Sequence, residues 1–219
     1  MQEALKIMRG MAVALVIVLY AVLVHHVNAS GQVSLLGALL ALAPLLLITV
    51  TFSWSITSKL IGFSLVMAFC IIAWWTLPFI EQHTGLIFWL QDIGLMLILL
   101  VTFARTLLPS RKPLCAHFAE MINGGTLPIA HERYAYKVTV AWVGFFALMV
   151  LISSLLFFFS PLATWSLFVN FLTLPLVALM FIAEFMVRKQ VLTDLPTGNV
   201  LDAVRAYLNN SKNNSKRTH

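Results

Sequence analysis

Charged residues and cysteines are both scarce in this chain of 219 residues. Only 10% of the residues are charged, whereas an ordinary soluble domain carries about 25%. The two cysteines are Cys70, inside an apolar segment, and Cys115, inside a polar one. We expect them to lie apart, and two cysteines do not make a disulfide framework. The composition therefore argues against both a soluble globular domain and a disulfide-stabilised secreted one.

Motifs of soluble enzymes are also missing. The sequence holds no Walker A loop, nucleophile elbow, zinc-protease helix or Rossmann glycine fingerprint. We therefore assign no catalytic residue and no metal ligand, and we expect no cofactor. The net charge of +6 does not indicate nucleic acid as a partner, because the basic residues flank apolar segments and no zinc-finger or helix-turn-helix pattern accompanies them.

Long apolar segments are what the chain has in abundance. Apolar residues make up 61% of the sequence and fall in blocks of about twenty, the length that crosses about 30 Å of hydrocarbon as a helix. The pattern predicts an all-α integral membrane bundle of about six transmembrane helices. The six blocks cover residues 11–24 or 11–29, then 34–52, 60–79, 85–103, 138–159 and 162–187.

A polar stretch divides these blocks. We expect a four-span half at 1–104, a loop at 105–137, a two-span hairpin at 138–188 and a tail at 189–219. In the loop, Pro113 begins an amphipathic helix suited to the membrane interface, and Asn123-Gly124-Gly125 ends it. Pro128 then opens a second helix that continues into the fifth span. In the tail we expect a weak helix at 200–208 and disorder from 209 onward.

The first block also resembles a signal peptide. Lys6 and Arg9 form a basic head, and Val27, Ala29 and Ser30 fit a small-residue cleavage site. We favour an uncleaved span, because the next apolar block follows within a few residues and no secreted domain comes after it. Cleavage would leave five spans and the same cytoplasmic face.

The basic residues indicate the orientation. All 14 lysines and arginines fall in the head, the second connection, the loop or the segment after the sixth block, from 188 onward, whereas the opposite connections at 25–33, 80–84 and 160–161 hold none. Since cytoplasmic segments retain positive charge, both termini and the loop are predicted to be cytoplasmic. Tryptophans also fall where membrane interfaces are expected, and those assigned to the outer side are Trp74, Trp75, Trp89 and Trp165.

Asp92 is the most unusual residue of the apolar blocks. It lies about 12 Å inside the fourth span at helical rise, where a carboxylate usually faces protein or water. We expect it to form a polar cluster with residues of similar depth, namely Gln91, Asn170 and one of Ser153 and Ser154. The alternative is a set of interhelical hydrogen bonds that only fix the packing.

A second candidate site lies on the loop side. Its residues are predicted to bind a lipid phosphate or an acidic carrier protein, and they are Arg105, Arg111, Lys112, His131 and Arg133. Anchoring by the positive-inside rule alone explains the same basic residues equally well.

Other polar residues have simpler interpretations. Cys115 and His117 are about 200° apart on a helix, so they make a poor nucleophile and base. Adjacent His25 and His26 point in different directions and would not chelate a metal together. Glu184 and Arg188 stand at i and i+4, which predicts a local ion pair.

Three stretches resemble a known family. They are residues 105–115 (RTLLPSRKPLC), 141–147 (AWVGFFA) and 165–175 (WSLFVNFLTLP), continued to Glu184. They are similar to an uncharacterised family of bacterial inner-membrane proteins associated with gene clusters for aryl polyene or xanthomonadin-type pigments. The resemblance implies an inner-membrane location and a pathway, but it implies no reaction and no role for any residue.

Three classes of function follow. We favour a non-catalytic accessory or scaffold protein that gathers acyl-carrier or acyl-transfer enzymes at the membrane, with membrane lipids as its other partners. The alternative is a small lipid or metabolite transporter, or flippase, built around Asp92, for which homo-oligomerisation would supply a pathway. A membrane-embedded acyltransferase using His117, His131 or Glu132 is the third class.

Overall fold

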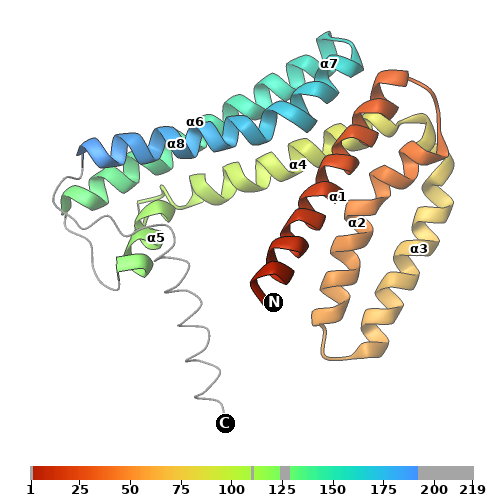
Figure 1. Cartoon of the computed structure of the whole chain (residues 1–219), viewed down its shortest axis with the longest axis horizontal. Coiled ribbons are helices and arrows are strands. Elements are labelled where there is room, and N and C mark those ends of the chain that lie inside the picture. Colours follow the sequence, from red (N-terminus) through yellow and green to blue (C-terminus); the bar gives the residue numbers. More distant parts are fainter. Residues whose placement is uncertain (1, 110, 124–128, 192–219) are drawn as a thin grey trace. The chain divides into compact units, whose positions relative to one another are not determined.

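The computed structural model describes residues 2–109, 111–123 and 129–191, and all of its regular structure there is helical (Figure 1). The elements are α1 Gln2–Ser30, α2 Leu35–Ser55, α3 Lys59–Gln82, α4 Thr84–Arg105, α5 Leu114–Asn123 and α6 Ile129–Phe159, followed by one continuous segment of α7 Leu162–Leu167, π-helix η1 Phe168–Leu172 and α8 Thr173–Val191.

Six of the helical segments are long and apolar enough to cross a membrane, as the sequence predicts. Their large apolar side chains are mostly exposed; Trp74 and Trp75, for example, are 76% and 82% exposed. Water would not tolerate so much apolar surface, whereas lipid would. The protein is therefore a multi-pass integral membrane protein.

The helices are longer than the predicted apolar blocks. The first begins at Gln2 and the fifth at Ile129, and the sixth runs on to Val191. Hydropathy marks only the part of a helix that lies in hydrocarbon, whereas backbone hydrogen bonding continues through polar residues. In the loop, α5 follows Pro113 as expected, and α6 runs from the loop into the fifth span. The predicted breaker at 124–125, Pro128 and the predicted features of the tail lie outside the described residues.

The chain forms two compact units. Unit 1 comprises Met1–Gly94 and Leu151–Pro175, and unit 2 comprises Leu95–Val150 and the chain from Leu176 onward. The units therefore divide α4, α6 and α8 between them.

Unit 1 packs through small residues. A Cβ added to Gly62 would lie 2.7 Å from the carbonyl oxygen of Ser53, so only glycine lets α3 approach α2 this closely. Ala38 and Ala41 of α2 are fully buried in a cluster with Val24 of α1. Cleavage after Ala29 would remove Val24 from this cluster.

Unit 2 packs through aromatic rings. Trp142 of α6 is 5% exposed, and its ring centroid lies 4.7 Å from that of Phe181 and 5.5 Å from that of Phe146. Phe103 of α4 contacts both Trp142 and Phe146. At one end of the unit, the Tyr134 hydroxyl donates to the Glu184 carbonyl oxygen at 3.1 Å and so joins α6 to α8.

Threonines hold α5 in place within unit 2. The backbone N–H of Leu114 donates to Thr106 Oγ1 at 3.0 Å, and that of Cys115 donates to Thr139 Oγ1 at 3.3 Å. The first amides of a helix lack partners within the helix, so these two hydroxyls from α4's end and from α6 satisfy them. The start of α5 is thereby fixed to both neighbouring segments.

Candidate functional site

Asp92 lies in a directed chain of hydrogen bonds within unit 1. Ser153 Oγ of α6 lies 2.6 Å from Asp92 Oδ2, and Trp165 Nε1 of α7 lies 3.0 Å from Ser153 Oγ. An indole N–H only donates, so Ser153 accepts from Trp165 and donates its own hydrogen to Asp92. Ser153 and Trp165 are each 1% exposed. The chain thus joins α4, α6 and α7.

A second group of polar side chains adjoins the first at Ser166. Asn170 Nδ2 donates to Ser166 Oγ at 3.1 Å, and His25 Nδ1 of α1 lies 3.3 Å from the same oxygen. Ser166 Oγ has two acceptor lone pairs, so it accepts from Asn170 Nδ2 and also contacts His25 Nδ1, where the direction of the hydrogen bond depends on the tautomer of the ring. Ser166 is fully buried, so this group fastens α1 to α7.

A π-helix lies within this second group. Asn170 stands in η1, and π-helical turns inside α-helices occur frequently at functional sites. The Thr173 backbone N–H donates to the Phe168 carbonyl oxygen, five residues earlier, and the Thr173 hydroxyl donates to the same oxygen at 3.4 Å. The signal in the sequence is Pro175, which cannot supply the amide that a regular helix needs at that position.

The predicted cluster around Asp92 is distributed over several partners. The structure brings Asp92 and Ser153 together, but Asn170 bonds Ser166. Gln91 Nε2 donates to the Ala41 carbonyl oxygen of α2 at 2.6 Å, and Ser154 has no hydrogen-bond partner among the described residues. Sequence reasoning missed Ser166, although its spacing of four from Asn170 was a usable signal.

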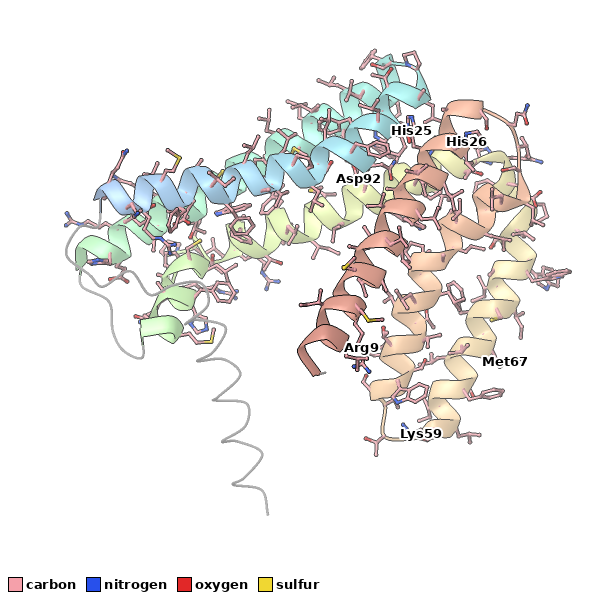
Figure 2. All side chains as sticks on the ribbon, in the orientation of Figure 1. Arg9, His25, His26, Lys59, Met67 and Asp92 are labelled. Carbon is pink, nitrogen blue, oxygen red and sulfur yellow. The ribbon has the colours of Figure 1, made fainter. Side chains whose placement is uncertain are left out.

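The chemistry open to this arrangement is limited. Trp165 Nε1 cannot accept a proton, so the chain through Ser153 and Trp165 does not conduct protons between Asp92 and His25. Ser153 and Ser166 are too deeply buried to attack a substrate. Within the described residues Asp92 Oδ1 has no hydrogen-bond partner. Figure 2 shows Asp92 toward the same end of unit 1 as His25 and His26.

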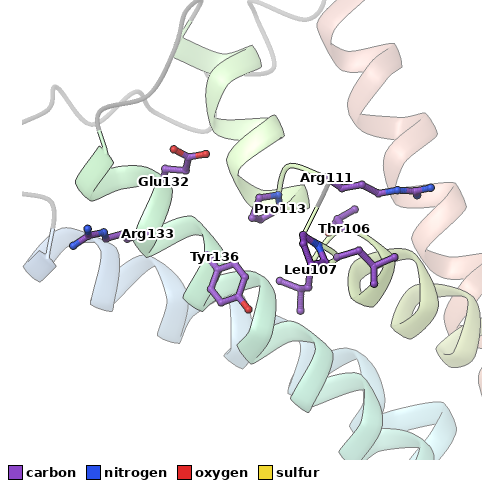
Figure 3. Close-up of a pocket in the computed structure, with 9 residues that line it drawn as sticks. Thr106, Leu107, Arg111, Pro113, Glu132, Arg133 and Tyr136 are labelled. Carbon is purple, nitrogen blue, oxygen red and sulfur yellow. The ribbon is translucent and has the colours of Figure 1, made fainter.

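The second candidate site contains a groove in unit 2 (Figure 3). Its volume is about 380 Å³. The connection after α4 supplies one wall, with Leu107, Leu108 and Arg111, and the first turns of α6 supply the other, with Glu132, Arg133 and Tyr136. Figure 3 shows the side chains of Arg111 and Arg133 reaching out on opposite sides.

The five predicted basic residues differ in their exposure and in their partners. Arg111 and Arg133 are exposed and line the groove, and Arg105 is exposed at the end of α4. Lys112 Nζ instead lies 2.8 Å from Glu120 Oε1, and this carboxylate raises the pKa of Lys112. Both ring nitrogens of His131 are buried and lack hydrogen-bond partners in the part of the chain that the structure describes.

The remaining candidates show no catalytic geometry. Cys115 is half-buried, and burial is the main cause that raises the pKa of its thiol, which opposes formation of a nucleophilic thiolate. The His117 ring lies against Phe118, with 6.4 Å between centroids. Within the described residues, no group of three histidine, cysteine, aspartate or glutamate side chains could hold a metal ion. Glu184 and Arg188 approach to 3.7 Å, as their spacing predicts.

A comparison with protein-family models, curated proteins and solved structures finds no match to this chain.

Proposed function

We propose that this chain is a non-catalytic accessory protein of the bacterial inner membrane that gathers acyl-carrier or acyl-transfer enzymes of an aryl polyene or related lipid pathway. In this proposal the chain crosses the membrane six times, and both termini and the loop at 105–137 are cytoplasmic. The pathway is taken from the sequence resemblance, and the role from the exposed charges of unit 2.

The distribution of charge within unit 1 supports the orientation. Figure 2 shows Arg9 and Lys59 toward one end of this unit and His25 and His26 toward the other. All lysines and arginines of the chain fall in segments predicted to share the side of Arg9 and Lys59. Retention of positive charge on the cytoplasmic side then gives cytoplasmic termini.

The observation that carries the accessory role is the exposure of three arginines in unit 2. Arg105, Arg111 and Arg133 are all exposed, and they lie on the segments that α5 joins through its threonine contacts. Exposed arginines steer an acidic partner and pair with its carboxylates. Lys112 contributes less to such a surface, because Glu120 already pairs with it.

Cross-linking tests this role. The full chain in lipid nanodiscs is incubated with the host's acidic acyl carrier protein, and we expect a cross-link to the loop. The triple variant Arg105→Gln/Arg111→Gln/Arg133→Gln should lose most of the cross-link and lose salt dependence with it.

The matched control removes three other exposed charges, Lys59→Gln/Lys137→Gln/Lys189→Gln, and should retain the cross-link. A reporter at His219 verifies that both variants keep the wild-type topology. Equal loss in both triple variants, or a wild-type chain that cross-links no carrier, would contradict the accessory role.

A second candidate function is transport of a small lipid or metabolite around Asp92. The observation in its favour is the unpartnered Asp92 Oδ1 inside a span, since intramembrane carboxylates commonly mark substrate pathways. Asn in place of Asp92 keeps an oxygen that accepts from Ser153. Transport therefore predicts that Asp92→Asn abolishes product export while leaving thermal stability near that of the wild type; full export by this variant would exclude it.

A further inference from the structure

The groove of unit 2 lies at the ends of two spans. The span of α4 ends at Arg105, two residues before Leu107, and the candidate span that contains most of α6 begins at His131. Glu132, Arg133 and Tyr136 belong to the first turns of that span. Helix ends of this kind lie at the depth of the lipid headgroups, just outside the hydrocarbon.

Its lining combines apolar walls with a charged rim. Leu107, Leu108 and Pro113 provide apolar surface, and Leu108 is 51% exposed. The rim carries Arg111 and Arg133 against Glu132, which leaves a net charge of +1 when 2 cations are set against 1 anion. A ligand that suits both parts has an anionic head and an apolar tail.

We propose that this groove binds one anionic glycerophospholipid from the surrounding leaflet. The phosphate contacts the guanidinium of Arg111 or that of Arg133, which lie on opposite sides of the groove, and the first carbons of an acyl chain lie along Leu107 and Leu108. The volume of about 380 Å³ is at the low end of the roughly 300–1,000 Å³ of small-molecule sites. It accommodates a headgroup with the start of a chain, while the rest of the lipid remains in the bilayer.

A protein surface fits the groove less well than a lipid. An acidic protein would pair with the arginines, but it would leave the apolar walls uncovered unless it also inserted a side chain. A lipid reaches the groove laterally from the bilayer, because the walls begin where the apolar spans end. This inference is independent of the proposed accessory role, although both use Arg111 and Arg133.

The test measures lipids retained by the purified full chain. Nanodiscs of phosphatidylcholine containing phosphatidylglycerol are disrupted with mild detergent, and native mass spectrometry counts bound lipids. We expect one retained phosphatidylglycerol in preference to phosphatidylcholine. Loss of a charge-assisted hydrogen bond weakens binding by roughly tenfold or more, so Arg111→Gln/Arg133→Gln should retain at least roughly tenfold less, whereas Lys137→Gln/Lys189→Gln should retain as much as the wild type.

Filling the groove separates this proposal from the accessory role. Leu108→Trp keeps every arginine and places a ring that is favoured at membrane interfaces, so it should lose the retained lipid and keep the cross-link to the carrier protein. Leu107→Trp serves the same purpose if Leu108→Trp alters the melting temperature. Retention of phosphatidylglycerol by a folded, groove-filled variant, or equal retention of phosphatidylcholine by the wild-type chain, would overturn the proposal.

Discussion

The two units differ in what joins their helices. Unit 1 places buried polar side chains between spans, so that Trp165, Ser153 and Asp92 link three helices through two hydrogen bonds. Unit 2 surrounds Trp142 with phenylalanine rings and uses hydrogen bonds chiefly at its loop end. Lipid tails are as apolar as the side chains, so helices in a membrane associate through close packing and interhelical hydrogen bonds. The two units show these two solutions in one chain.

The largest expected effect is the removal of the ring at the centre of unit 1. Trp165 is 1% exposed, and Trp165→Ala loses its packing as well as its bond to Ser153. Truncating a buried tryptophan typically costs about 3–5 kcal/mol, and we expect a clear fall in melting temperature in nanodiscs. The control is Trp75→Ala, at an 82% exposed position, which should change the melting temperature little.

Replacing tryptophan by phenylalanine tests the difference between the units directly. At position 165 the change leaves Ser153 without its donor, at a cost of about 1–3 kcal/mol in addition to lost packing. At position 142 the ring makes aromatic contacts, and a phenylalanine preserves most of them. Trp165→Phe should therefore lower the melting temperature more than Trp142→Phe. Equal effects at the two positions would remove the proposed distinction.

The sequence predicted much of this fold because membrane spans follow from composition alone. The six apolar helices could be predicted for that reason. The start of α5 could be predicted from Pro113. That Asp92 would meet Ser153 or Ser154 could be predicted too, since depth in the bilayer follows from counting residues at helical rise, although counting does not choose between the two serines.

The rotation of each helix about its own axis could not be predicted from the sequence in this way. Gln91 turns to the Ala41 carbonyl oxygen, away from the position that its neighbour Asp92 occupies, because successive residues point about 100° apart on a helix. Trp165 was interpreted as a ring at the outer interface, yet it is almost fully buried and donates to Ser153. Which face meets protein is decided by packing against the other helices, and one sequence alone does not reveal it.

Adjacent serines in α6 provide a finer test of the polar chain. Ser153→Ala removes the acceptor of Trp165 and the donor to Asp92, whereas Ser154→Ala removes a hydroxyl that bonds none of the described residues. Interhelical hydrogen bonds in membranes contribute about 0.6 kcal/mol on average and at most about 1.7 kcal/mol. Because Ser153→Ala breaks two such bonds, we expect it to lower the melting temperature measurably, whereas Ser154→Ala should change the melting temperature little. A larger loss at Ser154 would contradict the assigned bonds.

The smallest effect concerns the pH dependence of Cys115 in unit 2. Burial raises the pKa of this thiol above its ordinary value of about 8.5, so the folded chain disfavours the thiolate. The protonated Cys115 thiol contributes to the free energy of unfolding. This contribution is fully present below the pKa of the thiol in the unfolded chain, and it is lost as the pH rises through the pKa of the thiol in the folded chain. In the variant Cys70→Ser, iodoacetamide labelling should rise at a higher pH than for a free cysteine peptide, and denaturation should abolish the difference. A folded chain whose labelling follows the peptide's pH profile would show that α5 leaves this thiol open to water, despite the contacts that hold its first turn to Thr106 and Thr139.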